Sequence, residues 1–510
     1  MKIRKLTLTK LINTVFILFI CFFSNKSVAQ LSLNGQLRLR TEIRDGVGNL
    51  VSEDSTPASF ISQRTRLNFG YKWDRLNFGA TVQDVRVWGQ DASSISNADG
   101  NKLMLHEGWA ELILANKADT TIGFKYIDNL SLKIGRQELV YDDARLIGNL
   151  DWLQQGRRFD MALLKAVHKG WQVDIGFAYN QNTDTFGITG TSYIPGNIPQ
   201  YVKNDIGILV STPPGMVPLT AANGNSSPTG NPAYTNPPNT NAGNQDYKHF
   251  KSLYISKKIN QTKISILGFQ DAFGKYTLGS VAAGGGNVYG RIFNVNSTNN
   301  RYTYGAMVNP VFGSALQGAI AIQAAYYQQQ GKDRDGKNLD AYHYTVSASY
   351  LKGQLAIGPG LDVLSGNKIG TPATSNKRFD PLYGTPHKFW GYMDFFYAGT
   401  NSPASGLINY YLKSKFTAKN FFIAGDYHYF QLQNKLTPAL QKHLGNEFDL
   451  TLNYTLNKYT SVELGYSMMF ANKDVMSATK GQSIPDLNET GKWGYMAINI
   501  RPDFLYKKPQ

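Results

Sequence analysis

The chain alternates between apolar and polar positions over long stretches. From residue 31 to residue 44, odd positions are apolar or small and even positions are polar or charged. A two-residue period of this length predicts a β-strand with one apolar and one polar face. Residues 64–73 repeat the pattern, with Leu67 on the apolar face and Arg64 and Arg66 on the polar face. In a sandwich the apolar face would be internal, whereas in a membrane barrel it would contact lipid.

The spacing of such segments favours a membrane barrel. Strand-like segments occur at residues 31–44, 60–73, 76–88, 103–116, 129–138, 156–168, 171–181, 247–260, 262–271, 299–312, 316–330, 340–353, 354–364, 405–416, 419–433, 445–457, 460–471 and 491–504. Short and long links mostly alternate between them, as in outer-membrane barrels with tight periplasmic turns and long outer loops. We predict an all-β, transmembrane antiparallel barrel of about 18 strands with long extracellular loops, and about 16 strands as the next choice.

Two segments need separate treatment. Residues 387–399 also look like a strand, but including them would give an odd strand number and a long periplasmic link at 472–490. We therefore predict that residues 387–399 belong to an extracellular loop. The longest link, 182–246, is rich in Asn, Thr, Pro and Gly. It is either a mobile external loop or a loop that folds into the lumen as a constriction.

The first 29 residues have the pattern of a secretory signal peptide. Basic residues precede an apolar run at 11–23, and Ser27-Val-Ala29 supplies the small residues of a cleavage site. The run is too short to span a bilayer, which takes about 20 residues. Removal of residues 1–29 leaves 30–510 as a single barrel. It also removes five basic residues and the only cysteine, so the net charge falls from +16 to +11.

Composition excludes several classes of function. With 17% charged and 42% hydrophobic residues, the chain is neither a disordered polyelectrolyte nor a helical membrane protein. A mature chain without cysteine has no thiol catalysis and no thiolate metal site. The seven histidines lack metal-ligand spacing, and no nucleophile elbow, phosphate loop or dinucleotide motif occurs. We therefore expect no catalytic residue, metal or cofactor, and no nucleic-acid partner.

Charged residues at strand positions are the candidates for a solute pathway. Asp84 and Arg86 share one strand face, as do Arg158 and Asp160, so each pair can lie in the lumen. Arg136 faces inward only if Gly135 begins a bulge. The candidate pore-lining residues are Arg64, Arg66, Asp84, Arg86, Arg136, Arg157, Arg158 and Asp160. Inward arginines suit passage of an acidic solute; alternatively, these charges only brace the wall through ion pairs.

Four motifs together resemble the alginate-export family of outer-membrane barrels. In chain order they are QDVRVWG at 83–89, GRQ at 135–137 with WLQQGRRFD at 152–160, GLDVLSG at 360–366, and FDPLYGTPHKFWG at 379–391. The resemblance implies an eighteen-stranded monomeric channel whose arginine-rich constriction passes an acidic polysaccharide. It matches the motif arginines to Arg86, Arg136, Arg157 and Arg158, their acidic neighbours to Asp84 and Asp160, and a late loop constriction to His387 and Lys388.

The sequence thus predicts a channel in the outer membrane of a double-membraned bacterium. The expected function is passive passage of an anionic solute, an acidic poly- or oligosaccharide such as alginate, through an arginine-lined lumen. The expected partners are outer-membrane lipid, that solute and the barrel-assembly machinery, and the expected state is a monomer. Two alternatives stay open: an outer-membrane barrel hydrolase, and a surface adhesin or scaffold that uses the long loops.

Overall fold

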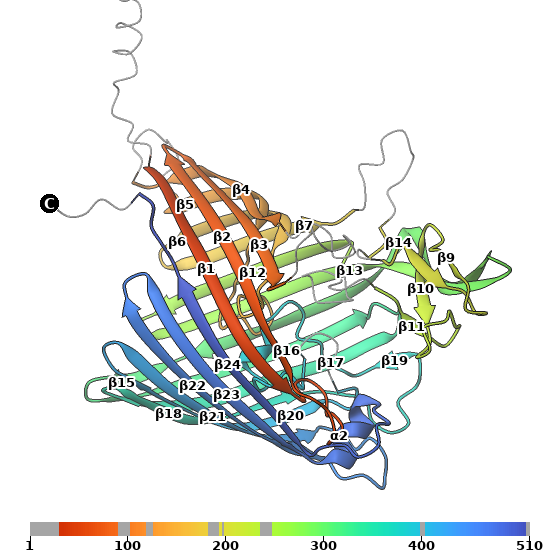
Figure 1. Cartoon of the computed structure of the whole chain (residues 1–510). Helices are drawn as coiled ribbons and strands as arrows, with labels where there is room; N and C mark the ends of the chain where they lie inside the picture. The colour runs from red at the N-terminus through yellow and green to blue at the C-terminus, as the bar shows by residue number, and fades with distance from the viewer. Residues whose placement is uncertain are drawn as a thin grey trace, which may run out of the picture.

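A closed antiparallel barrel of eighteen strands forms the body of the molecule (Figure 1). The computed structural model describes residues 30–89, 103–118, 126–181, 193–195, 198–234, 247–397 and 403–505. Strand β1 (Gln30–Asp45) pairs with β2 (Ala58–Trp73) on one side and with the last strand, β24 (Thr490–Ile500), on the other. This pairing of the first and last strands closes the barrel. The predicted signal peptide lies outside the described residues.

The other barrel strands follow in chain order around the ring, each paired with its neighbours. They are β3 (Leu76–Val87), β4 (Leu103–Asn116), β5 (Asn129–Gln137), β6 (Phe159–His168), β7 (Trp171–Tyr179), β12 (His249–Ile259), β13 (Thr262–Ala283), β14 (Gly286–Asn309), β16 (Gly318–Lys332), β17 (Asn338–Lys352), β18 (Leu355–Leu364), β20 (Leu407–Thr417), β21 (Phe421–Leu432), β22 (His443–Asn457) and β23 (Thr460–Ala471). A short strand, β15 (Val311–Ser314), continues β14 along β16. The predicted fold class is therefore confirmed.

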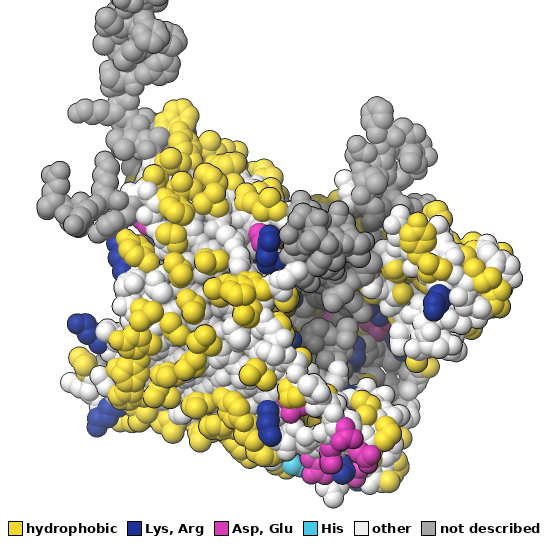
Figure 2. All heavy atoms as spheres, viewed as in Figure 1, with side chains coloured by type: hydrophobic (Ala, Val, Ile, Leu, Met, Phe, Trp, Pro, Cys, Tyr) yellow, Lys and Arg dark blue, Asp and Glu magenta, His cyan; other side chains and the backbone are white. Residues whose placement is uncertain are grey.

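The outer surface is apolar, as the alternation predicts. Side chains such as Leu67, Phe69 and Ile134 are exposed on the outer wall, while Arg64 and Gln83 are buried on the inner one. Figure 2 shows hydrophobic side chains spread over the barrel wall. Such an apolar band suits contact with lipid. Within the part of the chain that the structure describes, no helix is long and apolar enough to cross a membrane.

One region predicted as a loop is instead a pair of extended strands. β13 and β14 run 22 and 24 residues, so most of 272–298 is paired rather than irregular. The turn uses Gly284 and Gly285, both with positive φ, which is the conformation that tight hairpins require. The hairpin therefore projects beyond the barrel, at the right of Figure 1.

The described part of the link 182–246 lies on this projection. It forms β8 (Tyr201–Lys203), β9 (Leu209–Ser211), β10 (Met216–Thr220) and β11 (Asn231–Pro232). β10 pairs with β14 through Pro218 and Gly290, and Met216 and Val288 share a small core with Val202. Of the two alternatives for this link, the described residues fit an external arm.

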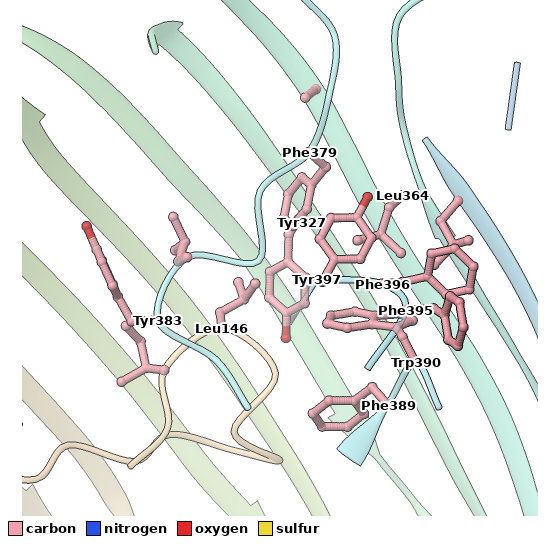
Figure 3. Packing of buried hydrophobic residues seen from close by; sticks show 14 of the residues in the cluster. Leu146, Tyr327, Leu364, Phe379, Tyr383, Phe389, Trp390, Phe395, Phe396 and Tyr397 are labelled. Atoms are coloured by element: carbon pink, nitrogen blue, oxygen red, sulfur yellow. The ribbon is translucent and has the colours of Figure 1, made fainter. Parts of the chain in front are cut away.

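Two other segments fold into the barrel and give it an internal core. We call residues 138–158, between β5 and β6, the strap. The second is the β18–β20 loop, residues 365–406, described apart from 398–402. Ile147 of the strap and Tyr383 of the loop form a β-bridge. Figure 3 shows the resulting aromatic cluster, which includes Phe379, Trp390 and Phe396.

The β18–β20 loop contains little regular structure. It holds β19 (Ser375–Asn376) and the short helix η2 (Pro386–Lys388). The described part of 387–399 contains no strand, as predicted. Outside the barrel, helix α2 (Lys473–Lys480) follows β23 in the last long loop.

Gly391 allows the β18–β20 loop to approach the wall closely. Its φ is +85°, and a Cβ atom there would lie 2.5 Å from Oε1 of Glu447. The close approach at Gly391 lets the two following backbone amides reach the wall. Met393 N–H donates to Glu447 at 2.7 Å, and Tyr392 N–H donates to Asp449 at 3.3 Å. The wall thus holds the loop through two buried carboxyl groups.

We expect Gly391→Val to release this contact. Backbone strain of about 1–3 kcal/mol and the clash with Glu447 both oppose docking, so local opening becomes at least about tenfold more frequent. Trypsin cleavage after Arg378 and Lys388, followed by mass spectrometry in detergent micelles, measures this. Gly370→Val is the control, because Gly370 also has positive φ but a Cβ atom there would meet no other residue within 4 Å. Equal cleavage in both variants would contradict the prediction.

Candidate functional site

Arginines of β1 and β2 fix one end of the strap. Arg38 donates from Nη1 to the Asp151 carbonyl at 2.7 Å and from Nε to Gln154 Oε1 at 3.0 Å. Arg64, fully buried, forms a 2.8 Å ion pair with the Asp151 carboxylate. Both side chains point into the lumen because they occupy the polar face of their strands. Each guanidinium therefore binds the strap rather than lying open to solvent.

Two more arginines extend this cluster. Arg66 donates to Gln83 at 2.7 Å, lies 3.0 Å from His106 Nε2, and approaches Asp151 to 3.6 Å. Arg40 donates to the Trp152 carbonyl at 2.9 Å, and its guanidinium lies 4.3 Å from the centre of the Trp152 ring. The strap end is thus enclosed by cations.

Three of these cations converge on a single carboxylate. Burial alone would raise the pKa of Asp151, but Arg64, then Arg38 and Arg66, outweigh it, so the pKa lies below its ordinary value. Asp151 is therefore ionised at neutral pH and balances one of the three positive charges. Glu138 offsets part of the remaining positive charge, because its Oε1 lies 3.7 Å from Nη1 of Arg66.

The other end of the strap is fixed on the opposite wall. Asp142 accepts hydrogen bonds from Tyr254 and Ser265, each at 2.7 Å, and lies 3.0 Å from Lys263. Arg145 forms a 2.6 Å ion pair with Asp362 of β18. In ring order, β13 and β18 lie across the barrel from β1 and β2. The strap therefore crosses the lumen.

The β18–β20 loop locks onto the strap and onto a third part of the wall. Arg157 donates to the Gly384 carbonyl at 2.5 Å, and burial lowers its pKa to about 10. Asp380 forms a 2.6 Å ion pair with Arg301 of β14, and Arg301 also binds Asp271. Two inserted segments and three wall regions thus form one polar and aromatic network.

His387 and Lys388 lie at the junction of the two inserted segments. The His387 ring stacks on Trp152 with centres 4.4 Å apart, and Nδ1 lies 2.8 Å from Asp394. Lys388 donates from Nζ to the Asp143 carbonyl at 3.2 Å. The structure thus brings these two residues to the inserted loops, where the resemblance expects a constriction.

Comparisons with known proteins agree with this architecture. A family model described as alginate export matches residues 29–180, which contain β1 to β7. The resemblance to the alginate-export family is confirmed over this segment. The chain is a β-barrel of the outer membrane. No curated protein matches the chain.

Solved outer-membrane structures resemble the barrel over nearly its whole length. Acinetobacter baumannii OccAB1 has a TM-score of 0.55 at 10% identity, covering 94% of this chain and 100% of that one. Pseudomonas aeruginosa OccD3 has 0.54 at 11%, covering 94% and 93%. P. aeruginosa OpdK with vanillate has 0.51 at 11%, covering 92% and 99%. At such identities the likeness shows the fold.

Four of the predicted pathway residues lie on the outer wall of this outer-membrane barrel. Asp84 pairs across from Thr65, and Arg86 pairs across from Gln63, on the face opposite to Arg64 and Arg66. Arg86 binds Asp84 at 2.7 Å. The expected inward orientation of Asp84 and Arg86 is therefore wrong. β2 and β3 stay paired in a single register from their turn to the end of β3, so no bulge turns these two residues inward.

Arg136 and Asp160 are placed in the same way. They face each other across β5 and β6 and form a bidentate pair at 2.7 and 2.8 Å on the outer wall. Gly135 has positive φ, but the pairing with β6 continues without a shift, so no bulge turns Arg136 inward. Arg158 lies next to this pair at the end of the strap, and its Nη1 is buried without a hydrogen-bond partner in the described residues.

Several members of the network were missed by sequence reasoning. Arg38 and Arg40 lie in the same alternation as Arg64, so the pattern at 31–44 could have supplied them. Asp151 and Asp142 lie in an irregular segment without periodicity, and no local signal shows that this segment enters the lumen. Among the described residues, no group of three or more His, Cys, Asp and Glu is arranged for a metal.

We expect Arg64→Met to loosen the strap at its β1–β2 end. The variant loses the ion pair with Asp151, a charge-assisted contact worth about 1.5–3 kcal/mol. Gln154, 5% exposed, serves as reporter after Gln154→Cys, because residues 30–510 contain no cysteine. Maleimide labelling of that cysteine should be at least about tenfold faster with Arg64→Met. Arg86→Met, which breaks an outer ion pair, is the control; equal labelling in both would contradict the prediction.

We expect the outer end of the barrel to show a pH dependence that comes from Lys480 of α2. Its Nζ donates to the Phe395 carbonyl, and burial lowers its pKa to about 7, with Asp394 opposing. An unfolded lysine has a pKa of about 10.4, so between about pH 7 and 10 the unfolded state binds more protons and docking of α2 strengthens as pH rises. Hydrogen exchange of residues 392–397, corrected for intrinsic rates, should show this. Lys480→Met should remove the trend and Lys473→Met should keep it; a trend that survives Lys480→Met would contradict the assignment.

Proposed function

We propose that this outer-membrane barrel is a passive channel for anionic solutes and that its solute is an acidic poly- or oligosaccharide. The observation that carries the proposal is the convergence of Arg38, Arg64 and Arg66 on Asp151, at the strap that crosses the lumen. Positive charge exceeds negative charge there, and a low-dielectric wall extends the field of that excess into the lumen. An anion is therefore favoured in transit even where the arginines do not touch it.

Two further observations support the proposal. Residues 30–510 carry a net charge of +11, which favours anions at the channel mouths. The OpdK structure contains vanillate, a carboxylate, in a barrel of the same fold. The alginate-export match adds an acidic polysaccharide as the class of solute. The proposal assigns no catalytic residue, and it treats the chain as a monomer in outer-membrane lipid.

Reversal potentials in planar bilayers under a salt gradient test the proposed anion preference. The wild-type channel should favour chloride over potassium. Asp151→Asn should increase that preference and Arg66→Met should decrease it, each by roughly twofold, because they change the local charge in opposite directions. Arg86→Met, on the outer wall, should leave it unchanged. Cation preference in the wild type, or shifts of the same sign in both lumenal variants, would refute the proposal.

A further inference from the structure

The end of the barrel that carries the short turns is rich in basic residues. Among the described residues, a cation lies in or next to six of these turns: Arg75, Lys117, Lys169, Lys352, Lys419 and Lys458. The described acidic residues of the same turns are Asp74 and Asp128. Figure 2 shows Lys and Arg side chains at this end, at the left of the view, and Asp and Glu side chains near α2 at the other end. Positive charge is thus concentrated around one rim of the barrel.

The acidic residues of this rim leave several of its cations unpaired. Asp74 has a positive φ in the β2–β3 turn, and Asp128 accepts a hydrogen bond from the Lys169 backbone N–H at 2.7 Å. Asp128 also lies 3.7 Å from Nζ of Lys117. The side chains of Lys169, Lys352 and Lys419 are exposed, and within the described ranges none of them makes an ion pair or a hydrogen bond. These three ammonium groups are therefore available to an external partner.

Two of these lysines adjoin apolar side chains on the lipid-facing wall. Lys352 pairs with Leu355 across the β17–β18 turn, and Leu355 pairs with Phe416 of β20. Directly paired residues of antiparallel strands point to the same face, so the three side chains form a row on the outer wall. Leu355 is 45% exposed and Phe416 is 41% exposed. Lys419 follows Phe416 by three residues, in the next turn along the rim.

Lys169 has a similar apolar neighbour. Trp171, two residues further on, is 46% exposed on the outer wall. It pairs with Lys257 of β12, whose Nζ lies 4.7 Å from the centre of the indole ring. Tryptophan is typical of the level of the lipid headgroups, and a lysine there lays its stem on apolar surface while its ammonium reaches the headgroups. The combination of exposed ring and exposed cation thus occurs at two places on the rim.

We propose that Lys169, Lys257, Lys352 and Lys419, which we call the rim lysines, bind the headgroups of anionic phospholipids. Their ammonium groups donate charge-assisted hydrogen bonds to the lipid phosphate, and the apolar side chains beside them contact the acyl chains. Short turns lie on the periplasmic side of outer-membrane barrels, so the lipids are phospholipids of the inner leaflet. This inference is independent of the proposed channel, because it concerns the outer surface of the barrel.

Electron spin resonance of spin-labelled lipids tests the proposal. The full mature barrel is reconstituted in phosphatidylcholine vesicles, and its association with labelled phosphatidylglycerol is compared with that of labelled phosphatidylcholine. The wild type should favour the anionic lipid at least about threefold, since each cation near a membrane surface attracts anionic lipid. Glutamine at all four rim positions should bring the ratio close to one. High salt should do the same, because the Debye length falls to about 3 Å at 1 M.

Lysines of the long loops supply a matched control. The control variant loses the same charge at the other end of the barrel through Lys337→Gln, Lys368→Gln, Lys435→Gln and Lys473→Gln, and it should keep the wild-type ratio. Heat-modifiable migration on gels checks that every variant is a folded barrel. A wild type without preference, a preference that survives in the rim variant, or an equal loss in both variants would overturn the proposal.

Co-sedimentation with purified peptidoglycan distinguishes a second anionic partner on the periplasmic side. If the rim lysines bind phospholipid, the rim variant should sediment with peptidoglycan to the same extent as the wild type. Loss of co-sedimentation in the rim variant, together with equal association of both labelled lipids in the wild type, would assign the rim to the cell wall and overturn the lipid proposal.

Discussion

Eighteen strands enclose a lumen that their own side chains do not fill, and this constraint shapes the rest of the molecule. Barrels of this size leave an aqueous channel unless other parts of the chain enter it. Here the strap and the β18–β20 loop enter and bring their own aromatic core, with Trp390 and Phe395 fully buried. The barrel thus contains a second packed body, and the wall must hold it.

Holding an irregular segment inside a barrel is a problem of backbone hydrogen bonds. The strap has positive φ at Asp142, Ala144 and Leu150, so regular pairing with the wall is impossible there. Buried carbonyls still need donors, and arginine forks from β1 and β2 supply them to residues 151–153. The arginine cluster on two adjacent strands is explained by this need. The sequence suggests two roles for inward arginines, an anion pathway or bracing of the structure. The arginine–strap hydrogen bonds belong to the second role.

The sequence predicts the barrel well because the alternation of apolar and polar residues reveals its strands. That alternation depends only on which face of a strand contacts lipid. It predicts the inserted segments poorly, since residues 142–151 carry no periodicity and their partners lie on distant strands. Asp84 and Arg86 show a different limit. On β3, the even-numbered residues Leu76, Phe78 and Val82 face outward. Asp84 and Arg86, at the end of the strand, are also even-numbered and therefore face outward too. Charged residues are tolerated on the outer face near the membrane surface, where their cost falls. Register, rather than charge, decided their orientation.

The role of the arginines of β1 and β2 follows from their chemistry. A guanidinium presents up to five donors in a rigid plane, so one side chain can satisfy several fixed carbonyls of the strap. Passive conduction needs binding that is strong enough to admit a solute and weak enough to release it. Arginines bound to the strap have few donors left for a solute, so they favour a passing anion through their field and do not hold it.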